Sequence, residues 1–217
     1  MQERVFIWVA HPGEGTFNHA LADAYEQGAR SSGAKVRRMD LANMAFSTDF
    51  TGYADAPALE QDLLAWQENL AWATRVFIVH PLWWGAMPAL AKTVLDRGLT
   101  SGFAYKYRKG PGIKWDKLLD GRVGDAIITA DTPRWIDNWL YLRPARRILK
   151  DQVLGFCGIK PRKIKYAGSV KLSDEAQREK WLAQAFAMGA KKGTNLRPAT
   201  DFVAPASTDI AQLKIAA

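Results

Sequence analysis

The sequence predicts an α/β domain, in which a parallel β-sheet is covered by helices on both faces. Short apolar runs alternate with longer stretches of helical periodicity about five times along the 217 residues, which is the pattern of successive strand–helix–strand units. The first run, residues 5–10 (VFIWVA), is apolar at every position, as is typical of a strand buried on both faces. We therefore expect a five-stranded parallel sheet.

The strands of this sheet can be placed from the apolar runs. The second run carries charged residues (KVRRMDL), which favours a position at an edge of the sheet. The fifth run is short. We expect strands at residues 5–10, 35–41, 76–79, 125–130 and 164–168.

The helices can be placed from their start and stop signals. Asp55 and Pro57 predict the start of the second helix, and Pro88 suits the first turn of the third. The fourth is expected to be interrupted or to start near Pro144, and Ser173 is expected to cap the last. We expect helices at residues 17–30, 55–73, 88–98, 139–154 and 173–188.

Length and composition predict one domain. We expect residues 1–193 to form it and residues 194–217 to be an irregular C-terminal tail. No apolar run approaches the roughly 18 residues that span a bilayer, and the N-terminus has no signal-peptide pattern. The only cysteine, Cys157, has no partner for an intrachain disulfide. These observations predict a soluble, cytoplasmic protein that does not span a membrane.

The charge balance is basic, with 30 Lys and Arg against 22 Asp and Glu, a net charge of +8. Much of the excess lies in residues 143–150 and 160–166. No nucleic-acid-binding motif accompanies these clusters. A solvated face, or an attraction for anionic cofactors, is therefore the preferred interpretation, and no nucleic-acid partner is expected.

The loop that follows the first strand has features of an anion site. Residues 11–21 read HPGEGTFNHAL, in which glycines allow a close approach of the backbone and the next helix offers free N–H groups. Thr16 and Asn18 add a hydroxyl and an amide. The alternative is a tight strand-to-helix turn, capped by either residue. The two interpretations are about equally supported by the loop alone.

The loop that follows the third strand contains two adjacent tryptophans. Pro81 ends the strand, Gly85 permits a turn, and Trp83 and Trp84 stand between them. Both rings could plug the core. Alternatively they could form a wall on which a flat aromatic ligand stacks while free N–H groups bind its edge. A planar ligand with a polar edge and a phosphate fits both loops, and a flavin meets that description.

These residues resemble the NAD(P)H:quinone oxidoreductase (DT-diaphorase) family, which includes small bacterial flavin reductases and ancillary subunits of potassium-efflux systems. The resemblance rests on Pro81-Leu82-x-Trp84 with Pro88, on Phe103-Ala104-Tyr105 and on the loop from His11 to Asn18. Residues 155–159 (GFCGI) also resemble the stretch before the family's last strand. The resemblance covers most of the chain, to about Gly193.

The resemblance implies a flavodoxin-like three-layer fold and a homodimer with active sites at the interface. It implies bound FMN, with FAD as an alternative, and NADH or NADPH as hydride donor. The chemistry takes place on the flavin, so no catalytic side chain and no metal is assigned. The implied flavin contacts are His11, Thr16, Phe17, Asn18, Pro81, Leu82, Trp83 and Trp84. Tyr105 and Tyr107 are implied to close the substrate pocket from the partner subunit.

The chain departs from the family after the fourth strand. Where the family usually has Thr-Thr-Gly-Gly beside the flavin ring, this chain has Thr129-Ala-Asp131 followed by Thr132 and Pro133. Thr129 and Asp131 are retained as expected cofactor contacts. Trp135 is a candidate for the substrate pocket, together with Arg134 and Tyr141.

The expected function is hydride transfer from NAD(P)H through the flavin to a quinone, free flavin or similar small acceptor. Two alternatives belong to other classes. A flavodoxin-like electron carrier is typically acidic, which this chain is not. A flavin-binding regulatory subunit of a transporter or another enzyme agrees with the lost glycines.

Overall fold

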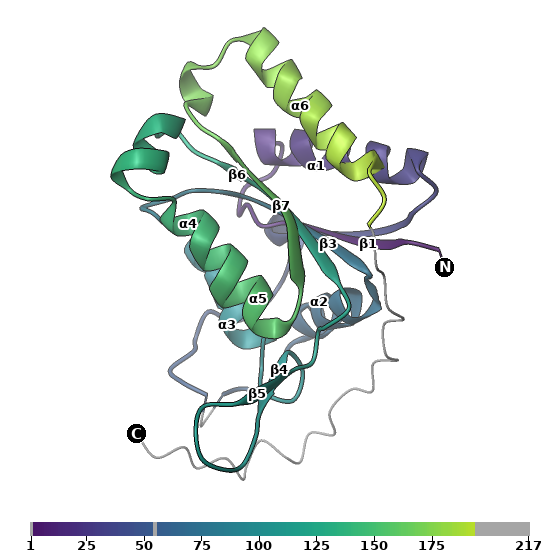
Figure 1. Cartoon of the computed structure of the whole chain (residues 1–217), viewed down its shortest axis with the longest axis vertical. Helices are drawn as coiled ribbons and strands as arrows, with labels where there is room; N and C mark the ends of the chain where they lie inside the picture. Colours follow the sequence, from purple (N-terminus) through teal and green to yellow (C-terminus); the bar gives the residue numbers. More distant parts are fainter. Residues whose placement is uncertain (1, 54–55, 194–217) are drawn as a thin grey trace.

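The computed structural model describes residues 2–53 and 56–193, and it has three layers (Figure 1). The central sheet is parallel throughout, with the strand order β2-β1-β3-β6-β7. The predicted α/β architecture is confirmed, and so is the edge position of the charged second strand. The strands are β1 (Arg4–Val9), β2 (Lys35–Asp40), β3 (Arg75–Pro81), β6 (Val123–Thr129) and β7 (Lys160–Ala167).

Helices cover both faces of the sheet. One core cluster joins the sheet to α1 (Phe17–Ser31) and α6 (Glu175–Ala190). The other joins it to α2 (Gln61–Trp72), α3 (Ala89–Gly98) and the segment that leads through α4 (Pro144–Arg147) to α5 (Gly155–Cys157). Strands β1 and β3 send alternate side chains into the two clusters, which is why their sequences are continuously apolar.

A small antiparallel hairpin, β4 (Tyr105–Tyr107) with β5 (Trp115–Lys117), was not predicted. Short 3₁₀ turns at Leu41–Asn43 and Val170–Leu172 follow β2 and β7. Two π-helical turns, Ile136–Leu140 and Ile148–Leu154, flank α4. Leu142 and Arg143, with φ of 58° and 60°, separate the first of these turns from α4. The predicted interruption near Pro144 is therefore confirmed.

The predicted start of the second helix is wrong. The helix begins at Gln61, after the extended residue Glu60, and Asp55 lies outside the described residues. The buried Arg97 explains the delay, because its Nη1 donates to Ser47 O at 2.9 Å and to Glu60 Oε1 at 2.8 Å. These bonds hold the preceding segment in an extended form against α3.

Other boundaries also differ from the sequence predictions, and two of them have a clear structural reason. The last helix is capped by Asp174, whose Oδ1 accepts from Gln177 N–H at 2.8 Å, whereas Ser173 Oγ donates to Val170 O. Strand β7 begins at Lys160 rather than at residue 164, because Arg162 finds a buried partner in Asp125. The tail predicted for residues 194–217 lies outside the described residues.

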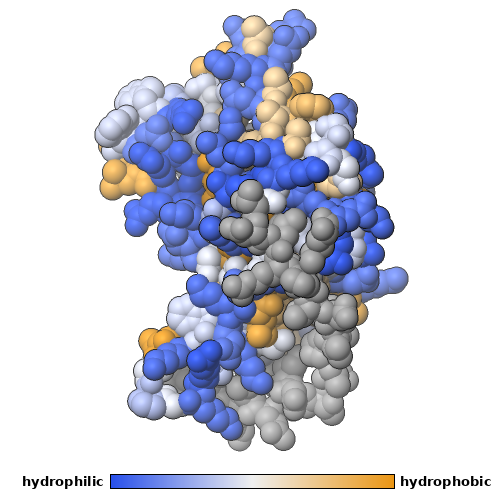
Figure 2. All heavy atoms as spheres, turned by 45° about the vertical axis from the view of Figure 1, so that its right-hand side comes forward, coloured by the Kyte–Doolittle hydropathy of each residue, from blue (hydrophilic) through white to orange (hydrophobic). Residues whose placement is uncertain are grey.

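Within the described residues, no helix is both long and apolar enough to cross a membrane. The face in Figure 2 is mainly hydrophilic, with apolar side chains in small groups.

The α1–α6 crossing requires two glycines. A Cβ on Gly28 would lie 2.1 Å from Phe186 O, and a Cβ on Gly189 would lie 2.0 Å from Tyr25 O. We expect Gly28→Ala to lower the free energy of unfolding by about 3 kcal/mol, because the two backbones must separate. Urea unfolding measures this loss. Gly33→Ala, at a glycine with φ of 85° in open space, is the comparison; a larger loss there would contradict the explanation.

Candidate functional site

Three loops meet where β1, β3 and β6 end. Leu82 N–H donates to Thr129 O at 2.7 Å, which joins the loop after β3 to the end of β6. Thr129 Oγ1 donates to Asn18 Oδ1 at 3.1 Å, which joins the same strand to the start of α1. Thr129 and Asn18 are both buried. The structure thus brings together the three loops that the sequence singled out, at the edge where open parallel sheets bind ligands.

The β1–α1 loop is organised by two histidines. His11 Nδ1 accepts from Gly13 N–H at 2.9 Å, and burial lowers the pKa of His11 below its usual 6.5. His19 Nδ1 accepts from Thr16 N–H at 3.3 Å and lies 2.8 Å from Thr16 Oγ1. Its Nε2 lies 3.8 Å from Asp40 Oδ2 at the end of β2. These contacts fix the turn that starts α1.

The first turn of α1 presents backbone donors. Thr16 is the N-cap, and its carbonyl accepts from His19 N–H and Ala20 N–H. Within the described part of the chain, no acceptor is found for the N–H groups of Phe17 and Asn18. Free N–H groups at a helix N-terminus favour an anion. The Phe17 side chain turns the other way and packs on Trp181 of α6, with ring centroids 6.0 Å apart.

The β3–α3 loop is a tight two-residue turn. Trp83 and Ala86 exchange backbone hydrogen bonds of 2.8 and 3.0 Å around Trp84 and Gly85, whose φ angles are 50° and 81°. Two positive φ values are those of a type I′ turn. For a residue as bulky as tryptophan, the left-handed conformation costs roughly 1–2 kcal/mol.

This turn places both tryptophans at the surface. Trp84 is fully exposed and Trp83 is 46% exposed, with its ring edge-on to His11 at a centroid distance of 5.7 Å. The alternative that both rings plug the core is therefore wrong. Pro81 is buried and paired with Thr129, and Leu82 is partly buried against the α2–α3 core. A half-exposed tryptophan ring beside a loop that favours anions offers a stacking surface for a flat, negatively charged ligand.

The segment after β6 turns its carboxylate away from this wall. Asp131 Oδ1 accepts from Lys171 N–H at 2.9 Å, in the 3₁₀ turn after β7. Tyr166 Oη donates to Thr132 O at 3.1 Å. Gly168 packs so closely here that a Cβ would lie 2.7 Å from Thr132 O. Asp131, Thr132 and Pro133 are thus fixed against the β7–α6 connection.

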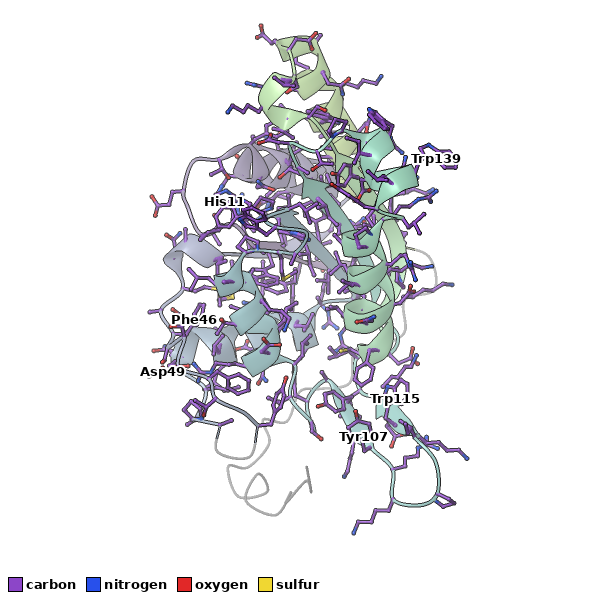
Figure 3. The ribbon with its side chains drawn as sticks, turned by 90° about the vertical axis from the view of Figure 1, so that its left-hand side faces the viewer. His11, Phe46, Asp49, Tyr107, Trp115 and Trp139 are labelled. Atoms are coloured by element: carbon purple, nitrogen blue, oxygen red, sulfur yellow. The ribbon has the colours of Figure 1, made fainter. Side chains whose placement is uncertain are left out.

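The residues predicted to form the substrate pocket do not lie close together within a single chain. Tyr105 and Tyr107 lie in the β4–β5 hairpin, where Tyr105 packs on Phe156 at 5.1 Å. Figure 3 shows Tyr107 and Trp115 together, well away from His11. Trp135 is 64% exposed in the segment after β6. Completion of the pocket by a partner subunit stays a prediction.

A groove of about 830 Å³ lies between α6 and the edge of β7. Arg134, Lys163, Lys165 and Lys180 line it, whereas His11, Trp83 and Thr129 do not. Burial, followed by the charges of Lys163 and Arg134, lowers the pKa of Lys165. This groove reaches Arg134 in the segment after β6, but it does not include the loops after β1 and β3.

Sequence reasoning gave no role to His19, Asp40 or His80. His19 follows Thr16 by three residues, the spacing of a capping box, and this signal could have identified it. Asp40 ends β2 and reaches the site only through the fold. His80 is buried at the end of β3 beside Pro81.

Comparison with known families matches residues 3–188 to the family described by its flavodoxin-like fold. The chain belongs to the flavodoxin-like family. The predicted family resemblance and flavodoxin-like fold are thereby confirmed. The five strands of the central sheet have the order 2-1-3-4-5.

The sequence relatives of this flavodoxin-like chain include NAD(P)H oxidoreductases and ribosyldihydronicotinamide dehydrogenases. An uncharacterized NAD(P)H oxidoreductase of Haemophilus influenzae is 28% identical over 181 residues, which cover 80% of this chain and 87% of the relative. NAD(P)H dehydrogenase [quinone] 1 of Rattus norvegicus is 31% identical over 147 residues, which cover 56% of this chain. The match spans only 53% of the rat protein.

Solved structures confirm the fold. An NAD(P)H:quinone oxidoreductase from Methanothermobacter marburgensis superimposes with a TM-score of 0.72 at 24% identity, over 88% of this chain and 98% of that one. An FMN-dependent NADH-azoreductase from Bacillus anthracis, solved in complex with FMN, gives a TM-score of 0.65 at 16% identity, over 87% and 98%.

Proposed function

We propose that this protein is a flavin-dependent NAD(P)H oxidoreductase, which passes a hydride from NADH or NADPH through bound flavin to a quinone, free flavin or similar small acceptor. The observation that carries the proposal is the contact of the half-exposed Trp83 ring with His11, in the loop that leads to the N-terminus of α1. FMN is the preferred cofactor and FAD the alternative. When bound, the flavin supplies the capacity to accept and release a hydride.

The residues present fit a flavin. The free N–H groups of Phe17 and Asn18 suit its phosphate, and the Thr16 hydroxyl lies at the same turn. Trp83 offers half of its surface for the ring. The N–H groups of Trp84 and Gly85, which have no acceptor within residues 2–53 and 56–193, suit the polar edge of the ring. Pro81, which is buried, and Leu82, which packs on the core, anchor the β3–α3 loop.

His11 contributes without carrying charge. Its lowered pKa keeps the ring neutral at pH 7 and above. Backbone dipoles at the start of α1 therefore supply the positive potential that His11 does not. The net charge of +8 attracts an anionic nicotinamide cofactor at long range.

The proposal includes a cytoplasmic homodimer. In it, Tyr105 and Tyr107 of each protomer reach the pocket of the other. Tyr107 lies far from His11 in its own chain (Figure 3), and Tyr105 packs on Tyr107 with ring centroids 5.4 Å apart, which is consistent with this arrangement. Burial raises the pKa of Tyr105, so its phenol stays a hydrogen-bond donor at neutral pH.

Flavin titration followed by anaerobic addition of NADH or NADPH tests the function. We expect binding of FMN or FAD, and bleaching of the oxidised-flavin absorbance by at least one nucleotide. Thr16→Val should weaken flavin binding by about tenfold or more, since a hydrogen bond to a charged group is worth about 1.5–3 kcal/mol. Thr93→Val, on α3, is the matched control.

Three outcomes would count against this proposal. Absence of binding by either flavin would exclude the enzyme. Binding without bleaching would support the regulatory-subunit alternative, which the replacement of the family glycines by Asp131, Thr132 and Pro133 favours. An unchanged dissociation constant for Thr16→Val would place the phosphate elsewhere.

A further inference from the structure

The groove between α6 and the edge of β7 carries a concentration of positive charge that the proposed hydride transfer does not use. Its volume of about 830 Å³ is typical of pockets that bind small molecules. Strand β7 is the last in the order of the central sheet, so one of its edges has no partner strand among the described residues. The lining side chains of β7 and α6 include Lys163, Lys165, Lys180, Trp181 and Gln184.

The three lysines face the same space because of the strand geometry and the position of α6. Lys163 and Lys165 alternate with Ile164 on β7, so both lie on the same face of the sheet. Lys165 Nζ donates to Gln184 Oε1 at 2.6 Å, which identifies this face as the one that α6 covers. Lys180 precedes Gln184 by four residues and therefore lies on the same side of α6.

No carboxylate compensates these lysines. Within residues 2–53 and 56–193, none of Lys163, Lys165 and Lys180 forms an ion pair. Among the described residues that line the groove, Asp174 is the one carboxylate, and its Oδ1 accepts from Gln177 N–H as the cap of α6. A cleft lined by one sign of charge concentrates its electric field and attracts ions of the opposite sign.

Protection of the sheet edge explains only part of this arrangement. Charged side chains that point inward on an edge strand prevent pairing with another chain, which would account for Lys163 and Lys165. Lys180 lies on α6, where no strand edge has to be protected. Trp181 also lines the groove, and its ring packs on Phe17 with centroids 6.0 Å apart. An aromatic ring beside three cations suits an anion that carries a flat group.

Lys165 is held in position to bind an anion. An ammonium group has three donors, and the bond to Gln184 Oε1 uses one of them. Burial, followed by the charges of Lys163 and Arg134, lowers the pKa of Lys165. A negative charge among these groups would offset this destabilisation of the charged lysine. The groove therefore offers preformed donors to a negatively charged ligand.

We propose that the groove binds a ligand with a diphosphate or triphosphate group. Lysine is a common phosphate ligand in proteins, and each of the three ammonium groups can bind a different phosphate oxygen. A single phosphate monoester carries no more than about two negative charges at pH 7. A chain of two or three phosphates therefore compensates the three lysines better than one phosphate does.

The groove lies apart from the proposed flavin contacts and from the proposed contact between subunits. His11, Trp83 and Thr129 do not line it. Tyr105, which the proposed homodimer uses, packs on Phe156 in the core cluster on the other face of the sheet from α1 and α6 (Figure 1). A ligand in the groove would thus bind each subunit without displacing either the flavin or the partner.

Calorimetric titration of the full chain with inorganic pyrophosphate, in the presence of saturating FMN, tests this site. We expect pyrophosphate and ADP to bind, adenosine not to bind, and salt to weaken both interactions. Lys163→Gln/Lys180→Gln should raise the dissociation constant for pyrophosphate by about tenfold or more. A lower dissociation constant for ADP than for pyrophosphate would assign the groove to nucleotides, and equal constants would assign it to inorganic polyphosphates.

The matched control is Lys35→Gln/Lys160→Gln, which makes the same change in net charge at two exposed lysines at the starts of β2 and β7. It should leave the dissociation constant unchanged. An equal loss in the control would indicate a general attraction, and it would overturn the proposal, as would no binding of pyrophosphate. Binding that FMN abolishes would place pyrophosphate at the turn of Thr16 and would also overturn it. Flavin binding, measured beforehand on the same samples, shows separately whether the proposed function fails.

Discussion

Replacing Asp125 with asparagine is expected to lower the free energy of unfolding by about 3–5 kcal/mol, the range found when one partner of a buried ion pair is lost. Asp125 lies on β6 and is completely buried. Its carboxylate accepts from Tyr25 Oη at 2.7 Å and from Arg162 Nε at 2.9 Å. The burial of Tyr25 raises the pKa of its phenol well above 10, so it remains a donor.

The loss of stability extends beyond one ion pair, because Arg162 also binds a carbonyl at the C-terminal end of α6. Arg162 Nη2 donates to Met188 O at 2.8 Å, and the fully buried Arg75 donates to Gly189 O at 2.9 Å. Carbonyls at a helix C-terminus have no partners within the helix and favour a cation. Glu3 Oε1 lies 3.2 Å from Arg75 Nε, and Asp125 forms a second ion pair, with Arg162. Each carboxylate therefore compensates a cation that holds the end of α6, the buried Arg75 or the partly buried Arg162.

Urea unfolding of Asp125→Asn, Arg162→Gln and the double variant measures the coupling. We expect the double variant to lose less than the sum of the single losses, because removal of one partner leaves the other charge uncompensated. Asp116→Asn breaks the exposed pair with Arg108 and should cost less than about 1 kcal/mol. A loss of that small size at Asp125 would contradict the buried-network explanation.

The same network shows what the sequence could and could not predict about the fold. The apolar runs of β1, β3 and β6 identify the buried strands, because both faces of each are covered. The first half of β7 is polar, and it was missed because Arg162 is held in the strand by pairing with the buried Asp125, 37 residues away. The β4–β5 hairpin consists of two three-residue strands, which is too short for a periodic signal.

The site was predictable in its location but not in its orientations. The loops at residues 11–18 and 80–88 were identified because glycine, proline and tryptophan interrupt regular patterns there. The outward direction of Trp84 depends on the type I′ turn, and no periodicity specifies that conformation for a tryptophan. The direction of Asp131 depends on Lys171 N–H, forty residues away. His19 and Asp40 also meet only through the fold.

Lowering the pH from about 6.5 to 4 is expected to destabilise the protein through His80. This side chain is 2% exposed, and its Nδ1 lies 2.8 Å from Pro81 O. A carbonyl only accepts, so Nδ1 carries the proton of a neutral ring. Burial lowers the pKa of His80 from 6.5 to about 4. Between these values the unfolded chain binds a proton that the folded protein excludes, and stability falls as the pH falls.

The size of this effect follows from the displacement of the pKa. At 1.36 kcal/mol for each pKa unit, the full loss at about pH 4 is roughly 3 kcal/mol. His80→Asn keeps a side-chain amide that can donate to Pro81 O and removes the titration. The difference in unfolding free energy between the parent and this variant should therefore shrink as the pH is lowered from 7 to 4.5, because only the parent loses the contribution.

Urea titrations of both proteins at several pH values give this difference directly. The pH-dependent contributions of the carboxylates cancel in it, because both proteins contain the same carboxylates. His11→Asn is the control, since the pKa of His11 is also lowered by burial but the ring is only partly buried. We expect a smaller change for it than for His80. Parallel pH profiles of the parent and His80→Asn would show that the buried ring accepts its proton in the folded state. The conclusion that His80, at the end of β3, is neutral in the folded protein would then be wrong.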